Sequence, residues 1–389
     1  MTQPKELKKE SFDVIELAQE LIRCPSVTPN DAGAQDFLSA RLEELGFKCH
    51  HIQCAEVPNL FARIDSDKEG PHLCYGGHTD VVPPGPEDKW IYGPFNPHIE
   101  NGVLYGRGAS DMKGSVAAFT AAVASYFAKN GGKPKKGSIS MLITGDEEGP
   151  SINGTAKVLE WMKKHDQLPD VALVGEPTNP EFLGQEIKIG RRGSLTGEIT
   201  VRGKQGHVAY QHLAHNPLPQ LIRILEVLSS TVFDQGSAYF PATNLEVTTI
   251  DVGNPAENII PQSGRAMFNI RYSDRWNGQS LSTKVQEIVA GAAKGADYTL
   301  DLRRGAESFL TKPGTWSGVV ADAVERVTGK RAAFTTNGGT SDARFISKYC
   351  PVVEFGGINK TIHQINEHEK VSDLHQLKEI YETILELYF

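Results

Sequence analysis

Apolar and polar positions follow two different periods along the first half of the chain. Strand-like apolar runs occur at 59–65, 72–77, 137–144 and 170–175. Segments in which apolar residues have helical spacing lie before and between them, at 11–24, 31–47, 114–130 and 154–165. Apolar strands that alternate with amphipathic helices predict an α/β domain with a mostly parallel central sheet flanked by helices. Ligands of such sheets bind beyond the carboxyl ends of the strands.

The pattern changes near Gly190. Alternating strands and two helices then follow in the order β-α-β-β-α-β, at 194–204, 215–230, 243–253, 263–273, 282–295 and 297–305. This order is typical of a ferredoxin-like α+β module. The α/β pattern returns after about Arg304. We therefore predict a catalytic domain made of residues 1–189 and 304–389, with a module of residues 190–303 inserted into it.

Composition narrows the class of protein. The chain has 389 residues, of which 39% are hydrophobic and 23% charged, and this balance is typical of globular proteins. A net charge of −8 argues against nucleic acid or an anionic membrane as the main partner. The chain contains no apolar run of about 18 residues, the length that would predict a membrane span. The stretch MTQPKELKKESFDVIELAQELI is charged and helical, unlike a signal peptide.

The five cysteines are scattered, and no CxxC occurs. We therefore expect neither a disulfide framework nor a thiolate zinc site, and we expect a cytoplasmic location. Any metal must then be held by histidine and carboxylate.

The stretch HLCYGGHTDVVPPG ends a predicted strand with His78 and Asp80. Polar residues often gather where a strand leaves the core, so an HxD pair can be ordinary. Alternatively, a carboxylate that accepts a hydrogen bond from one ring nitrogen of His78 leaves the other nitrogen free for a metal. The local sequence leaves both interpretations open.

Two further motifs carry acidic residues next to predicted strands or helices. Asp111 lies in NGVLYGRGASDMKGS, where it could cap the following helix or bridge two ions. This motif is not a dinucleotide fingerprint, because the third glycine of G-x-G-x-x-G would fall on Asp111. In LITGDEEG, Glu147 and Glu148 form either a solvated turn or a metal ligand beside a free general base.

Glu176 in VGEPT and His363 in TIHQINE complete the set of candidate ligands. Two ions about 3.5–4 Å apart, bridged by Asp111, would use the whole set. Nitrogen and oxygen ligands without thiolate favour a pair of zinc ions, with cobalt or manganese as substitutes.

These motifs occur in the order found in the zinc-dependent M20 metallopeptidases, and the chain resembles that family over nearly its whole length. The resemblance implies one zinc bound by His78, Asp111 and Glu176, and another bound by Asp111, Glu148 and His363. It also implies that Asp80 orients His78 and that Glu147 is the general base.

Other segments narrow the resemblance, namely RRGSLTGEITVRGKQGHVAYQHLAHNP, ENIIP, NGGTSDARF and GGINKTIHQINEH. They are similar to the branch of the family that cleaves N-succinyl-LL-2,6-diaminopimelate to succinate and LL-2,6-diaminopimelate, in lysine biosynthesis. The substrate is then a small acidic molecule. The positions implied to bind it are Arg191, Ser194, Tyr210, Asn258, Arg271, Gly339, Thr340 and Asn359.

The resemblance also implies a homodimer in which the inserted module serves as lid and dimerisation domain. His207 and Asn258 would reach the partner's site, where His207 would stabilise the oxyanion. Rival functions are another M20 deacylase or carboxypeptidase, such as an acetylornithine deacetylase, and a non-catalytic metal-binding homologue. Glu147 beside Glu148 argues against the last, since a pure binder needs no unligated base.

Overall fold

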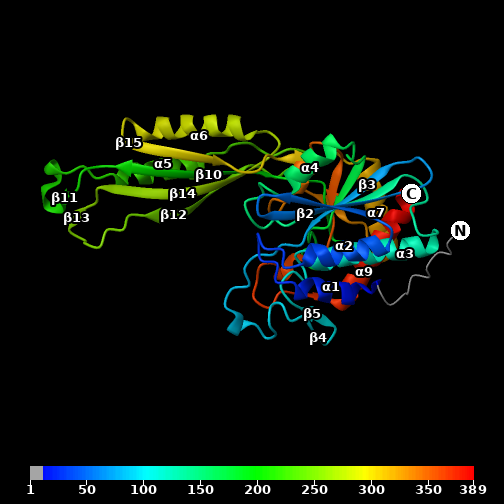
Figure 1. Ribbon diagram of the computed structural model, residues 1–389. Helices are drawn as coiled ribbons and strands as arrows, with labels where there is room; N and C mark the ends of the chain where they lie inside the picture. Colours follow the sequence, from blue (N-terminus) through cyan, green and yellow to red (C-terminus); the bar gives the residue numbers. More distant parts are fainter. Residues whose placement is uncertain (1–11) are drawn as a thin grey trace. The chain divides into compact units, whose positions relative to one another are not determined.

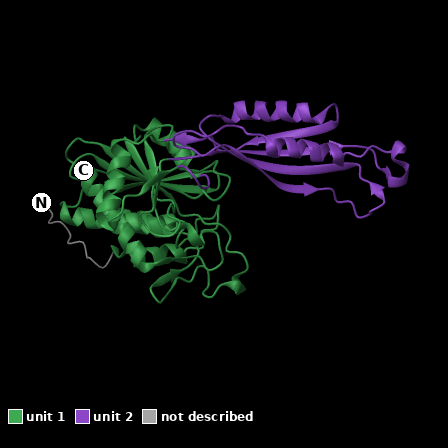
Figure 2. Ribbon diagram, turned by 180° about the vertical axis from the view of Figure 1, so that it is seen from behind, with its two compact units in different colours: residues 1–189, 311–335, 341–389 green, residues 190–310, 336–340 purple. Residues whose placement is uncertain are grey.

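The computed structural model describes residues 12–389 (Figure 1). The first eleven residues, part of the stretch predicted to be charged and helical, lie outside the described residues. The chain divides into two compact units, which Figure 2 shows in different colours. The first unit contains the described residues up to Ile189, then Thr311–Thr335 and Ser341–Phe389. The second contains Gly190–Leu310 and Thr336–Thr340.

The first unit is built on an eight-stranded sheet with the order β1-β2-β6-β3-β7-β18-β8-β17. The strands are β1 (Lys48–Cys54), β2 (Val57–Asp65), β3 (His72–His78), β6 (Ser138–Thr144), β7 (Val171–Val174), β8 (Glu186–Lys188), β17 (Ala333–Thr335) and β18 (Val352–Glu354). The central pairs β6-β3, β3-β7 and β7-β18 are parallel, as is β8-β17. The pairs β1-β2, β2-β6 and β18-β8 are antiparallel. The predicted α/β fold with a mostly parallel sheet is confirmed.

Helices cover both faces of this sheet. They are α1 (Val14–Arg23), α2 (Ala34–Glu44), α3 (Lys113–Lys129), α4 (Thr155–Lys164), α7 (Thr315–Thr328), α8 (Ala343–Ile346) and α9 (Val371–Tyr388). Neighbouring strand residues point to opposite faces. A methyl group on Gly77 would meet Met112 and Val116 on the α3 side, whereas one on Gly76 would meet Ile346 of α8. Helices α1, α7 and α9 join α3 on its face, and α4 packs with α8 on the other.

Short elements complete the first unit. A three-stranded sheet has the order β19-β5-β4, and two short 3₁₀ segments lie in loops. These elements are β4 (His98–Glu100), β5 (Val103–Tyr105), β19 (His368–Lys370), η2 (Glu87–Lys89) and η4 (Asn359–Thr361). Among residues 12–389, no helix combines the length and hydrophobicity that a membrane span requires.

The second unit has the β-α-β-β-α-β order that its alternation pattern indicates. Its main elements are β10 (Gly193–Arg202), α5 (Leu218–Ser230), β12 (Asn244–Asp251), β14 (Ser263–Tyr272), α6 (Gly278–Ala293) and β15 (Asp297–Arg304). The sheet order is β12-β14-β10-β15, and all pairs are antiparallel. Alternate residues of the strands, such as Ile199 and Phe268, form one core with Leu225 and Val285 of the two helices.

The second unit takes in more of the chain than the range 190–303. Beyond β15 it includes β16 (Phe309–Leu310), which pairs with β9 (Gly190–Arg191). It also includes Thr336–Thr340. The Thr336 hydroxyl donates a hydrogen bond to the main-chain oxygen of Tyr239, at 2.6 Å. Such contacts join segments far apart in the sequence, so the alternation pattern gives no sign of them.

Candidate metal centre

Three neighbouring parallel strands end together at one edge of the central sheet. In the order β6-β3-β7, His78 lies opposite Thr144, and Gly76 lies opposite Val174. Glu147 and Glu148 follow β6, and Glu176 follows β7. The register therefore brings these carboxylates to the strand end that carries His78.

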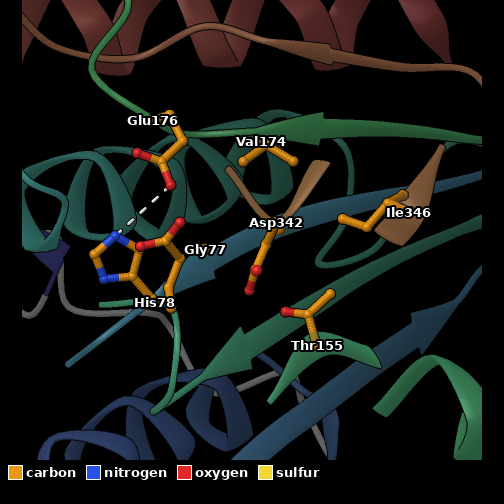
Figure 3. A pocket seen from close by; sticks show the side chains of 9 residues that line it. Gly77, His78, Thr155, Val174, Glu176, Asp342 and Ile346 are labelled. Carbon is orange, nitrogen blue, oxygen red and sulfur yellow. Dashed lines mark ion pairs between the residues drawn. The ribbon is translucent and has the colours of Figure 1, made fainter. Parts of the chain in front are cut away.

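Glycine is required where β7 delivers Glu176. A methyl group on Gly175 would lie 1.9 Å from the Tyr75 hydroxyl, so no larger residue fits there without rearrangement. The Glu176 side chain points toward His78 in Figure 3, and a carboxylate oxygen lies 3.7 Å from His78 Nε2.

Asp111 lies between two histidines. Its Oδ1 is 3.3 Å from His78 Nε2, and its Oδ2 is 3.3 Å from His363 Nε2. His363 Nε2 is also 2.9 Å from Glu148 Oε1. The two oxygens of one carboxylate thus face two different imidazoles, which is the arrangement expected of a ligand that bridges two ions.

The side chains form three groups of possible metal ligands, and within each group the ligand atoms lie within 4.8 Å of one another. The groups are His78 with Asp111 and Glu176, Asp111 with Glu148 and His363, and His78 with Glu147 and Glu148. The first two match the ligand sets that the sequence resemblance implies. The third shows that Glu147 also lies within ligand distance, so proximity alone does not separate a base from a ligand.

The chemistry of this donor set fits a pair of divalent cations. His78 Nε2 and Asp111 Oδ1 are both buried, and neither has a hydrogen-bond partner among the described residues. Buried polar atoms are rarely left unpaired unless an ion or water satisfies them. Imidazole nitrogens and carboxylate oxygens are ligands that zinc accepts.

Asp80 supports the centre in two ways. Its main-chain oxygen accepts a hydrogen bond from His78 Nδ1 at 2.8 Å, which leaves His78 Nε2 facing the carboxylates of Asp111 and Glu176. Its carboxylate oxygens accept from the backbone N–H groups of Glu147, at 3.3 Å, and Glu148, at 3.0 Å. The carboxylate itself is 3.7 Å from His78 Nδ1. The nearest partner of the ring is therefore the peptide oxygen, and the side chain of Asp80 holds the turn after β6.

Negative charge dominates the electrostatics of the centre. Loss of solvent and the neighbouring charge of Glu176 raise the pKa of Glu147 well above its usual range. Burial raises the pKa of Asp80 to about 6. Hydrogen bonds with Asp111 and Glu148 raise the pKa of His363 to about 10. Burial or neighbouring carboxylates thus favour the protonated form of each of these three groups.

The structure adds residues to this site that the sequence did not single out. A cavity beside His78, Glu147 and Glu176 is closed on its other side by Thr155 and Asp342 (Figure 3). Asp342 is buried, and burial raises its pKa. A carboxylate in the Gly-rich segment NGGTSDARF was the only available signal.

A family model described as peptidase family M20/M25/M40 matches residues 74–387. The chain belongs to this family. Curated relatives named succinyl-diaminopimelate desuccinylase include one from Rhodospirillum centenum, 52% identical over 382 residues and covering 97% of each chain. Another, from Methylorubrum populi, is 50% identical over 380 residues and covers 96% of this chain and 97% of its own.

Solved structures of M20 proteins share the fold. An aminopeptidase PepT from Bacillus cereus has a TM-score of 0.79 at 19% identity, covering 98% of this chain and 99% of its own. An M20 family metallo-carboxypeptidase from Sulfolobus solfataricus has a TM-score of 0.77 at 20% identity, covering 97% and 99%. A Bacillus subtilis protein described as a dinuclear metal-binding M20 peptidase has a TM-score of 0.71 at 15% identity, covering 96% and 97%.

The remaining candidate residues of this M20 chain form two groups in the second unit, apart from Asn359, which begins η4 in the first. In the first group, Ser194 of β10 lies opposite Arg271 of β14. Arg191 lies in β9, just before β10. The guanidinium of Arg191 lies against Gly338, which is next to the candidates Gly339 and Thr340.

The second group surrounds the short pair of β11 (Gly206–His207) with β13 (Ile259–Ile260). The Val208 N–H donates a hydrogen bond to the main-chain oxygen of Asn258 at 3.1 Å. The centres of the Tyr210 and His207 rings lie 5.6 Å apart. The roles of both groups stay predictions.

The shared position of Asp111 generates a prediction about zinc content. Replacement of Glu176 by Ala should remove one of two zinc ions, because Glu176 belongs only to the group with His78 and Asp111. Replacement of Asp111 by Ala should remove both, because Asp111 belongs to the two sets. Metal analysis after dialysis against zinc measures this difference. Equal zinc content in the two variants would contradict the bridging arrangement.

Proposed function

We propose that this chain hydrolyses N-succinyl-LL-2,6-diaminopimelate to succinate and LL-2,6-diaminopimelate, a step of lysine and diaminopimelate biosynthesis, with two zinc ions at the edge of the central sheet. The observation that carries the proposal is the match of about half of all positions, over nearly the full chain, with curated desuccinylases. The convergence of His78, Asp111, Glu148, Glu176 and His363 supports it.

Zinc, when bound, supplies Lewis acidity and lowers the pKa of water toward about 7. His78, Asp111 and Glu176 would hold one ion, and Asp111, Glu148 and His363 the other. Cobalt or manganese could replace zinc at such ligands. Asp80 would keep His78 Nε2 turned toward the ion, because its peptide oxygen accepts a hydrogen bond from Nδ1.

Glu147 would move the proton. It takes a proton from the attacking water as the oxygen joins the amide carbon, and it returns a proton to the amine as the carbon–nitrogen bond breaks. Its backbone N–H is fixed by Asp80, so the side chain begins from a defined position.

His207 would donate to the oxyanion. Its Nδ1 accepts a hydrogen bond from the Ala209 N–H at 3.1 Å, which leaves the proton on Nε2. The ring can therefore donate from Nε2, and it lies on an exposed segment of the second unit. Arg191 and Arg271 would pair with carboxylates of the substrate, because guanidinium groups bind carboxylates through paired hydrogen bonds.

The choice of substrate tests this proposal directly. Purified protein with zinc should hydrolyse N-succinyl-LL-2,6-diaminopimelate roughly 10²-fold faster than N-acetylornithine, since polar groups built for a succinyl carboxylate stay unpaired with an acetyl group. Amine release measures both reactions. Faster hydrolysis of the acetyl compound, or of a tripeptide, would assign the chain to another M20 activity.

Replacement of Glu147 by Gln tests the proton transfer. Turnover should fall by about 10²–10⁴ because an amide cannot accept the proton, while zinc content stays that of the wild type. Replacement of the exposed Glu160 in α4 by Gln is a matched control that should leave turnover unchanged. A Glu147→Gln enzyme that keeps its rate would show that another group is the base.

Mixed dimers test whether His207 acts on the partner's site. His207→Ala alone should lower turnover by about 10²–10³. Mixing it with Glu147→Gln should restore roughly a quarter of wild-type activity, because half of the randomly paired dimers contain one intact site. Action of His207 within its own subunit predicts no recovery. Size-exclusion chromatography identifies the dimer, and a monomer with full activity would refute the shared site.

A further inference from the structure

A buried glutamate outside both ligand sets, Glu367, holds the turn that carries Asp111. Glu367 has no exposed surface. Its Oε1 accepts hydrogen bonds from the backbone N–H groups of Ser110, at 3.0 Å, and Asp111, at 2.9 Å. Its Oε2 accepts from the backbone N–H of Gly108, at 3.1 Å, and from the Arg107 guanidinium, at 2.7 Å. One carboxylate thus satisfies three backbone donors of the turn and one side chain.

The turn's own backbone holds only part of it, where the Ala109 N–H donates to the Gly106 oxygen at 3.1 Å. Helix α3 begins only at Lys113, and its N-cap, Met112, makes no side-chain hydrogen bond. Gly108 has a φ of +90°, a conformation that other residues rarely adopt. The N–H groups of such a turn point to one side, where they need an acceptor. Glu367 is that acceptor.

Glu367 also belongs to the loop that carries His363. This loop runs from η4 to β19, and β19 pairs with β5, just before the Asp111 turn. The main-chain oxygen of Glu367 accepts from the Gly106 N–H at 3.0 Å. Side chain and main chain of Glu367 therefore connect the two loops whose ligands, Asp111 and His363, lie 3.3 Å apart.

A buried ion pair between Glu367 and Arg107 could serve the stability of the fold alone. Buried ion pairs are weak evidence for stability, because desolvation offsets much of the attraction. Three of the four hydrogen bonds to the carboxylate come instead from the backbone of the turn, and one of them from Asp111 itself. This pattern favours control of where the ligand lies.

We propose that Glu367 is a positioning residue that places the Asp111 carboxylate between His78 and His363, and that tight binding of the metal pair depends on it. This inference rests on the metal pair of the proposed function. Hydrogen-bond partners behind metal ligands typically contribute about 10–100-fold in metal affinity. Glu367 contacts no ligand atom, so its effect acts through the backbone.

The first test replaces Glu367 by Gln and measures the affinity for Zn²⁺ by competition with a coloured chelator, with no substrate present. Glutamine keeps the shape but turns an amide N–H₂ toward backbone donors. Zinc affinity should fall by about 10–100-fold. The control is Glu382→Gln in α9, which removes a buried carboxylate paired with Lys129 and Lys378. That variant should bind zinc like the wild type.

Equal zinc affinities of E367Q and E382Q would overturn the inference while leaving the proposed function in place. A wild-type chain that binds no zinc would refute the proposed function and this inference with it. If circular dichroism shows that E367Q does not fold, the inference is tested instead by hydrogen exchange of the wild type after removal of zinc. The amides of Gly108, Ser110 and Asp111 should stay protected, and their exchange at the rate of an unfolded peptide would overturn the inference.

Discussion

Repulsion between carboxylates at one edge of the central sheet is the constraint on which the rest of the site depends. Asp111, Glu147, Glu148 and Glu176 gather around two imidazoles. Burying such charge without compensation costs several kcal/mol per group. Two divalent cations would balance this charge, and this explains why polar atoms of His78 and Asp111 are buried without hydrogen-bond partners in the described part of the chain. This set of imidazole and carboxylate donors suits divalent cations.

The positions of the ligands depend on peptide groups as much as on side chains. Asp80 accepts the N–H groups of the turn after β6, and Glu367 accepts those of the turn before α3. The His78 ring is held by a peptide oxygen. Acidic residues therefore act at two levels: some face the space for the ions, and others hold the backbone that presents them. Substitution of the supporting group would disturb the centre without removing a ligand.

Much of the fold and of the centre could be predicted from the sequence. The period of apolar residues indicated the α/β layers, because burial of one face repeats at the period of the element. Histidine and carboxylates after apolar runs indicated a metal site at strand ends, because parallel strands end at a common edge. The resemblance to M20 proteins added the ligand sets. Glu367 ends the motif TIHQINE, but the support that it gives to the Asp111 turn could not be predicted, since that turn lies 256 positions away in the sequence.

The sequence by itself determined the type of the longer elements and the kind of chemistry, because periodicity and side-chain character are local properties. Only the tertiary structure decided which groups meet. Asp111 and Glu367 are 256 positions apart, and Thr336–Thr340 join a unit that otherwise ends at Leu310. The tertiary structure likewise decided that three strand pairs of the central sheet are antiparallel. Contacts of this kind depend on how the whole chain packs, and no local pattern records them.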